Sequence, residues 1–155
     1  MNLQASLQAL QSVLDHAIAE RDEVTAHMYL SLENTRRIGS QMEQLQSYRE
    51  QYRQRWTAQF RQAAAIEVVQ SYQAFVTRLD HAIEQLRLQL EQAQTQAQQA
   101  RELLVARETR VASVRKLIER RLMEQGRTVA AREQKHSDER AAIASWHAAP
   151  SMMAN

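Results

Sequence analysis

The sequence predicts an all-α fold, a long two-helix antiparallel coiled-coil hairpin. Only two Gly and one Pro occur among 155 residues, so few residues favour tight turns. Only eight residues are aromatic, so few large side chains could fill a thick globular core. Gln, Ala, Arg, Leu and Glu dominate, a composition typical of long helices and coiled coils. Apolar residues recur at alternating spacings of three and four, which argues against disorder despite the polar composition.

The first run of this spacing predicts arm one of the hairpin, at about residues 2–60. A register that starts at Leu7 has eighteen positions up to Ile66, and thirteen of them are apolar. The polar exceptions gather between Arg21 and Thr35, so we expect the seam to be weakest there. Gly39 lies inside this arm, where a glycine costs about 1 kcal/mol of helix stability relative to alanine.

A second register predicts arm two, at about residues 72–146. It runs from Tyr72 to Arg121, and thirteen of its fifteen positions are apolar. Gly126 follows the last clean seam residues, and we expect it to end or kink the helix. Residues 1–146 are therefore expected to form a single coiled-coil hairpin, followed by a disordered tail over 147–155 with Trp146 anchoring its start.

The two registers do not join, which predicts a turn at about residues 61–71. The seam slips by one residue there, whereas a continuous coiled coil absorbs insertions of three or four. A reversal at about residue 66 would bring Tyr52 near residue 80. It would also place the alanine trio opposite Asn34 to Gln41, the trio being Ala93, Ala97 and Ala100. Such a hairpin would be a monomer in isolation, and a parallel homodimer acting as a generic coiled-coil tether is the competing interpretation.

Composition also restricts the cellular context. The chain has no cysteine, which excludes disulfides and thiolate metal sites and fits a reducing compartment. The N-terminal segment lacks the basic region and unbroken apolar core of a signal peptide, and no apolar run is long enough to cross a membrane. Residues 1–100 carry a net charge of −2 and residues 101–155 carry +4, so the C-terminal third is mildly basic.

No motif in the sequence predicts catalysis, so we expect no enzyme activity, no catalytic residue, no cofactor and no metal. The five histidines do not pair at helical spacing, and isolated glycines cannot build a phosphate-binding loop. Asp80, His81 and Glu84 are close together on a helix, but a solvated patch explains them better than a metal site. The segment 110–127 is the nearest approach to a basic nucleic-acid-binding helix, yet Glu119 and Glu124 interrupt it. We therefore expect no nucleic-acid partner and keep that function as an alternative.

Aromatic and apolar side chains form two stripes near the predicted turn. Each stripe has spacings of four, three and four, which places its members along one side of a helix. The stripes consist of Gln41, Leu45, Tyr48 and Tyr52 in arm one, and of Phe75, Leu79, Ala82 and Leu86 in arm two. Two interpretations remain open from the residues alone: ordinary packing between the arms, or a docking face for a second partner.

The same part of the chain resembles the FliJ family of bacterial flagellar export proteins. The segments that carry the resemblance are SYREQY at Ser47–Tyr52, SYQAFVTRLDHAIEQLRLQLEQ from Ser71, and REQKHSDERAA at Arg132–Ala142. Their order and spacing agree over about residues 40–142. The resemblance implies a two-helix antiparallel coiled coil similar to the central stalk of rotary ATPases. It also implies a cytosolic component of the flagellar type III export apparatus, located at the inner-membrane face of the basal body through protein partners.

The resemblance further implies three kinds of partner: the export ATPase ring, the cytoplasmic domain of the membrane export gate, and export chaperones. The paired ends far from the turn would enter the ATPase ring, with much of that surface supplied by Arg101 to Arg140. Some family members carry a histidine where this chain has Leu86, so a polar contact made through that side chain would be absent. A stalk of a virulence-type III secretion system is the alternative. By motif, gate binding falls on Phe75, Leu79, Ala82 and Leu86, and the neighbouring surface on Gln41, Leu45, Tyr48 and Tyr52.

Overall fold

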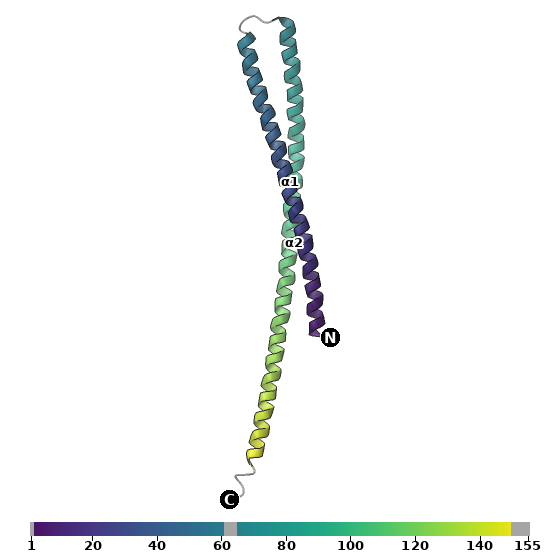
Figure 1. Ribbon diagram of the computed structural model, residues 1–155, viewed down its shortest axis with the longest axis vertical. Coiled ribbons are helices and arrows are strands. Elements are labelled where there is room, and N and C mark those ends of the chain that lie inside the picture. The colour runs from purple at the N-terminus through teal and green to yellow at the C-terminus, as the bar shows by residue number, and fades with distance from the viewer. Residues whose placement is uncertain (1, 61–64, 150–155) are drawn as a thin grey trace. The chain divides into compact units, whose positions relative to one another are not determined.

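The structure is a computed structural model that describes residues 2–60 and 65–149. It contains two α-helices: α1 spans Leu3–Phe60 and α2 spans Ile66–Ala148 (Figure 1). No strand occurs in the two described ranges. The helices pack against each other as a two-helix hairpin, which confirms the predicted fold class.

Local hydrogen bonds explain where both helices begin. The side-chain Oδ1 of Asn2 accepts a hydrogen bond from the backbone N–H of Gln4 at 3.2 Å, as an N-cap residue does. At the start of α2, the carbonyl of Ala65 accepts from the backbone N–H groups of Val68 and Val69. Glu67 adds a negative charge in the first turn of α2, where the helix dipole favours it.

The turn is shorter than the sequence predicted. We expected it at about residues 61–71, but α2 begins at Ile66, so residues 66–71 are helical and that part of the prediction is wrong. The β-branched residues there lower helix propensity only slightly, which the first turn of a long helix tolerates. The remaining turn positions, 61–64, lie outside the described residues.

The chain divides into two compact units, which we describe separately. Unit 2 comprises Glu20–Glu108, and unit 1 comprises Met1–Ala19 with Thr109–Asn155. In unit 2 the helices are antiparallel, since Arg49 of α1 pairs with Asp80 of α2 and the rings of Tyr52 and Phe75 lie 4.5 Å apart.

This pairing corrects two expectations about which residues face each other. Tyr52 contacts Phe75 and Tyr72 rather than residues near position 80. A Cβ added to Gly39 would meet Leu90, and His27 lines one groove with Ala100, so the alanine trio faces a stretch of α1 that begins before Asn34. Both shifts have one cause: the chain reverses between the end of α1 and residue 66, rather than at residue 66.

The predicted seam is confirmed, because every buried hydrophobic residue within 2–60 and 65–149 belongs to one of the two registers. The buried side chains of unit 2 include three alanines, whose small size lets the two helix backbones approach closely there. These residues are Ile38, Leu79, Ala93, Ala97 and Ala100 in unit 2, and Leu14, Ala17 and Val111 in unit 1.

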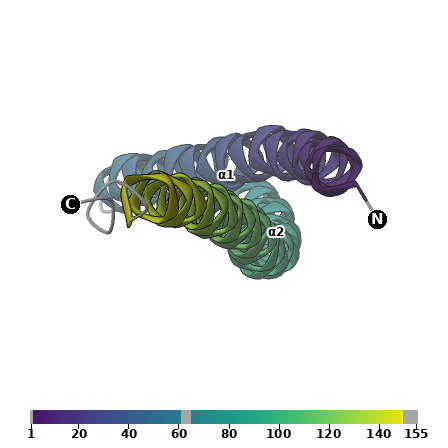
Figure 2. The same ribbon diagram turned by 90° about the horizontal axis from the view of Figure 1, so that it is seen from below.

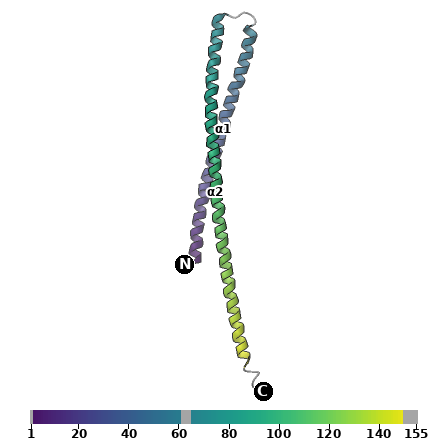
Figure 3. The same ribbon diagram turned by 180° about the vertical axis from the view of Figure 1, so that it is seen from behind.

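Unit 1 has a small core and a long exposed helical segment. Leu14, Ala17 and Val111 form the core, and three larger aliphatic residues pack beside it. Leu3, at the start of α1, lies in a groove with Val129 of α2. Every residue over 126–148 is exposed, and no third element accompanies the two helices in the described residues (Figures 2 and 3).

Three further expectations about the C-terminal region differ from the structure. Gly126 neither ends nor interrupts α2, which continues to Ala148. Trp146 is 76% exposed and its ring contacts the neighbouring His147, so it anchors no tail to the rest of the described chain. The expected disordered tail began at His147, but His147 and Ala148 are helical, and residues 150–155 lie outside the described residues.

Replacing Gly39 with alanine should stabilise the hairpin by up to about 1 kcal/mol, the difference in helix propensity between the two residues. The new Cβ would lie 3.9 Å from Leu90 Cδ1, an ordinary van der Waals distance. Thermal unfolding followed by circular dichroism measures the effect. The matched control is Gly126→Ala, where the added Cβ meets nothing within 4 Å. A lower unfolding midpoint for Gly39→Ala would show that the helices are closer at this level than described.

Acidification should weaken the helices through three exposed ion pairs. Hydrogen bonds from Arg36, Arg53 and Arg87 hold the pKa values of Glu33, Glu50 and Glu84, respectively, below their ordinary value of 4.5. A carboxyl whose folded pKa is depressed stabilises the folded state above its unfolded pKa and loses that contribution as pH falls through the folded value. The thermal unfolding midpoint should therefore fall as the pH is lowered below about 4.5. The fall should be smaller in a variant in which the three arginines are changed to glutamine. Equal acid sensitivity in both chains would contradict this origin.

Candidate protein-docking site

Six of the chain's eight aromatic residues form one continuous cluster at the turn end of unit 2. Tyr52 is central: its ring centroid lies 4.5 Å from that of Phe75 and 5.6 Å from that of Tyr72. Tyr72 in turn meets Phe60 at 5.4 Å. Such pairs contribute more than their buried area alone would give. The cluster consists of Tyr48, Tyr52, Trp56, Phe60, Tyr72 and Phe75.

Phe60 is the member of this cluster that the sequence analysis missed. It is half-buried at the last position of α1, one residue beyond the seam position Gln59. The signal that could have found it is its spacing of four from Trp56, because residues four apart contact each other on a helix. Its ring lies 5.3 Å from the ring of Trp56.

The eight residues singled out from the sequence fall into three groups in the structure: buried, exposed and half-buried. Leu79 is 8% exposed and belongs to the core, whereas Tyr48 is 45% exposed and Gln41 is also exposed. The other five are half-buried: Leu45, Tyr52, Phe75, Ala82 and Leu86. The structure therefore brings both stripes together, but it gives Leu79 a packing role.

Four of these residues share one side of the seam. Tyr48 and Phe75 each precede a seam residue, and their rings meet edge to face at 6.2 Å. Gln41 precedes Tyr48 by seven residues and Ala82 follows Phe75 by seven, so each lies on the same side as its counterpart. We call Gln41, Tyr48, Phe75 and Ala82 the aromatic flank.

The opposite side of the seam is charged. Asp80 follows the seam residue Leu79, and positions just before and just after the seam lie on opposite sides of it. Arg49 Nε donates to Asp80 Oδ1 at 2.5 Å, the interhelical ion pair of this region. Arg87 bonds both Glu84 and Glu91 on the surface of α2, and these carboxylates raise the pKa of its guanidinium. The turn end of unit 2 therefore has one apolar side and one ion-paired side.

One cation borders the aromatic flank. The guanidinium carbon of Arg78 lies 5.9 Å from the centroid of the Phe75 ring, within the range of a cation–π contact. An apolar partner surface with acidic groups at its edge would match both features. Aromatic residues and arginine are enriched at protein-docking surfaces, and both occur here, in the flank and at its border.

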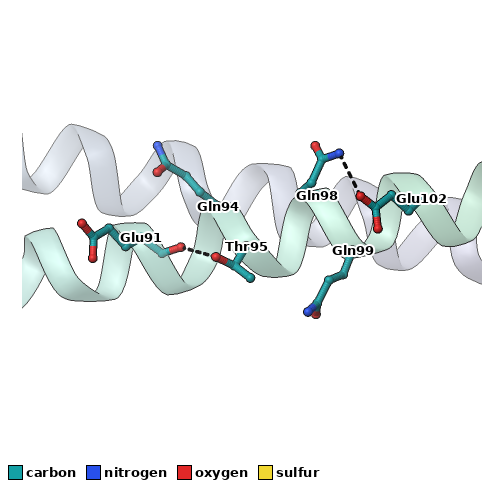
Figure 4. A pocket seen from close by; sticks show the side chains of 6 residues that line it. All are labelled: Glu91, Gln94, Thr95, Gln98, Gln99 and Glu102. Carbon is teal, nitrogen blue, oxygen red and sulfur yellow. Dashed lines mark hydrogen bonds between the residues drawn. The ribbon is translucent and has the colours of Figure 1, made fainter.

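The described residues include no group of three or more potential metal ligands, and none of their helices has the length and hydrophobicity to span a membrane. Asp80 and Glu84, considered above beside His81, are bonded to arginines. The groove on α2 between Glu91 and Glu102 is lined by polar side chains that point in different directions, and Gln98 bonds Glu102 there (Figure 4). It offers no convergent set of groups for a ligand.

Comparison with known proteins gives one result. Searches of curated proteins and of solved structures find no match. The family model described as "Flagellar FliJ protein" matches residues 6–150, which is most of the chain. Because it covers far more than half of the chain, this match shows that the chain belongs to the FliJ family of flagellar export proteins.

Proposed function

We propose that this protein is the non-catalytic stalk of the flagellar type III export apparatus. In this proposal the turn end of unit 2 binds the cytoplasmic domain of the export gate, unit 1 promotes assembly of the export ATPase ring, and the protein also binds export chaperones. It works in the cytoplasm and reaches the inner-membrane face of the basal body through its protein partners. The observation that carries the proposal is the aromatic flank, which occurs in a chain of this family and has no covering element in the described residues.

The gate-binding surface consists of the aromatic flank and the residues beneath it. Tyr48 and Gln41 supply exposed side chains, and Phe75 and Ala82 add half-buried ones. A large aromatic side chain that keeps nearly half of its surface in water gains free energy when a partner covers it. Leu45, Tyr52, Leu79 and Leu86 support this surface from the seam side, with Leu79 holding the two helices together.

Leu86 gives the surface a more apolar character than a histidine would. It is half-buried on the same helix as Phe75 and Ala82. A leucine neither donates nor accepts a hydrogen bond, so recognition at this position depends on shape and apolar contact. The gate partner should accordingly present aliphatic or aromatic side chains to this end of the surface.

The ATPase-ring surface is proposed for unit 1, where α2 is exposed from Gly126 onward. A helical segment with few packing contacts gains its stability from local interactions, or from a binding partner. Its exposed apolar side chains include Val129, Ile143 and Trp146. A ring of ATPase subunits that encloses this helix would cover these side chains from several directions.

Two substitutions on the aromatic flank should weaken gate binding while leaving the hairpin folded. Tyr48→Ala removes an exposed ring, and Ala82→Glu places a charge on the apolar surface. In the double variant we expect the dissociation constant for the purified gate domain to rise at least about tenfold, because one covered aromatic is worth about 1.4 kcal/mol or more. Calorimetric titration measures the affinity, and circular dichroism checks that the helices persist.

The matched control is Arg53→Gln on the charged side, which removes the ion pair with Glu50 and should leave gate affinity unchanged. Leu79→Ala is a poor probe of binding, because a buried leucine lost from a core destabilises the fold by about 2–5 kcal/mol. Normal gate binding by the flank variant, with impaired binding by Arg53→Gln, would place the docking surface on the charged side instead.

The stalk assignment predicts that the chain stimulates ATP hydrolysis by the flagellar export ATPase and promotes ring formation, measured by phosphate release and sedimentation. A chain truncated after Arg132 should lose most of this stimulation, since it lacks much of the exposed part of α2. The Tyr48→Ala, Ala82→Glu variant should retain it, because its changes lie at the turn end. Stimulation that survives truncation but fails in the flank variant would reverse the proposed assignment of the two ends.

A further inference from the structure

A layer of charge crosses the apolar seam where unit 2 ends. Arg21 of α1 and Arg107 of α2 both occupy seam positions, and both are partly buried. Arg107 Nη1 lies 3.1 Å from Glu20 Oε2, so the two arginines are at nearly the same level of the hairpin. Arg21 donates two hydrogen bonds to Asp22, its neighbour in α1.

The environment of this layer is unfavourable for charge. The side chains of Glu20 and Arg107 keep 26% and 35% of their exposure, and Arg107 Nε is buried without a hydrogen-bond partner among the described residues. For an ion pair removed from water, desolvation can exceed the Coulombic gain, and well-packed apolar side chains are often more stable in its place. Glu20 and Asp22 balance the charges of the two arginines, so desolvation is the unfavourable contribution in this layer.

A second interhelical ion pair of unit 2, that of Arg49 with Asp80, has a different environment. Arg49 and Asp80 keep 40% and 50% of their side-chain exposure, so more of their hydration survives. The seam position beside Asp80 is Leu79, so Arg49 does not face a second arginine in the seam. This pair lies inside unit 2, and the seam continues on both sides of it.

The charged layer coincides with the limits of unit 2, Glu20–Glu108. Unit 2 is closed by the turn and contains the aromatic cluster, whereas unit 1 contains the chain ends and has Leu14, Ala17 and Val111 as its buried core. The two helices separate most readily at their open ends. Separation that has reached a weak layer can continue only by disrupting the next cooperative unit.

We propose that the layer of Glu20, Arg21 and Arg107 is a built-in stop in the hairpin. Opening that starts at the chain ends halts at this layer, so unit 1 separates and re-forms as one cooperative unit while unit 2 stays folded. Unit 1 therefore opens transiently and exposes its apolar seam, while the turn end of unit 2 keeps its structure.

Hydrogen exchange of the full chain, read by mass spectrometry at neutral pH, tests this device. The backbone amides of residues 6–18 and 110–122 should share one protection level. Those of residues 24–56 and 76–104 should share a higher one, by about tenfold or more, because sub-global units open with distinct free energies. The step between the two levels should fall at the charged layer.

An apolar layer should remove the step. In a chain carrying Glu20→Gln, Arg21→Leu and Arg107→Leu, the protection of residues 6–18 and 110–122 should rise about tenfold, toward that of unit 2. The matched control is the double change Arg49→Leu with Asp80→Leu, which replaces the other interhelical ion pair and should leave the step in place.

Three outcomes would overturn the proposal. The first is a smooth gradient of protection from the chain ends, with no step at the layer. The second is a step that remains unchanged in the apolar-layer variant while circular dichroism shows it to be helical. The third outcome applies if that variant does not remain a folded monomer. The single change Glu20→Gln removes a carboxylate from the layer and should then speed hydrogen exchange of unit 1 about tenfold. Unchanged exchange in this single variant would contradict the proposal.

Discussion

The hairpin depends on one apolar seam between two helices. No third element accompanies them in the described residues, so each seam side chain is covered by the opposite helix alone, and no large side chain is completely buried. Every helical residue that does not face the seam remains in contact with water. Each layer of the seam therefore contributes only a small stabilising free energy, and the side chains in that layer decide how strongly the helices pair there.

The seam changes character along unit 2, and these changes create its surfaces. Alanines fill it at Ala93, Ala97 and Ala100, where the backbones can approach closely. Aromatic rings fill it toward the turn, and they are too large to be contained between two helices. Part of that aromatic surface consequently emerges on one side of the seam, while ion pairs occupy the other side. In the proposed function, the same aromatic side chains would therefore both hold the helices together and bind the partner.

The sequence predicted much of the fold and located the candidate site, but not its internal arrangement. The two registers include all eight residues that are buried in the described part of the chain, because heptad spacing follows directly from helix geometry. The facing pairs were wrong, as Tyr52 illustrates, since they depend on where the chain reverses and no Gly or Pro marked that point. The helical nature of residues 66–71 and the continuation through Gly126 were missed because local propensity is a weak guide inside a long helix.

By itself the sequence determined the helical class, the two seams, the absence of cysteine chemistry and the residues from which a docking surface could be built. The tertiary structure decided which of those residues remain accessible. Leu79 and Tyr48 lie in parallel stripes with the same spacing, yet Leu79 is buried and Tyr48 is 45% exposed. The physical reason is that exposure depends on the opposite helix: a side chain that points between the helices is covered, and one beside the seam is covered on one side only.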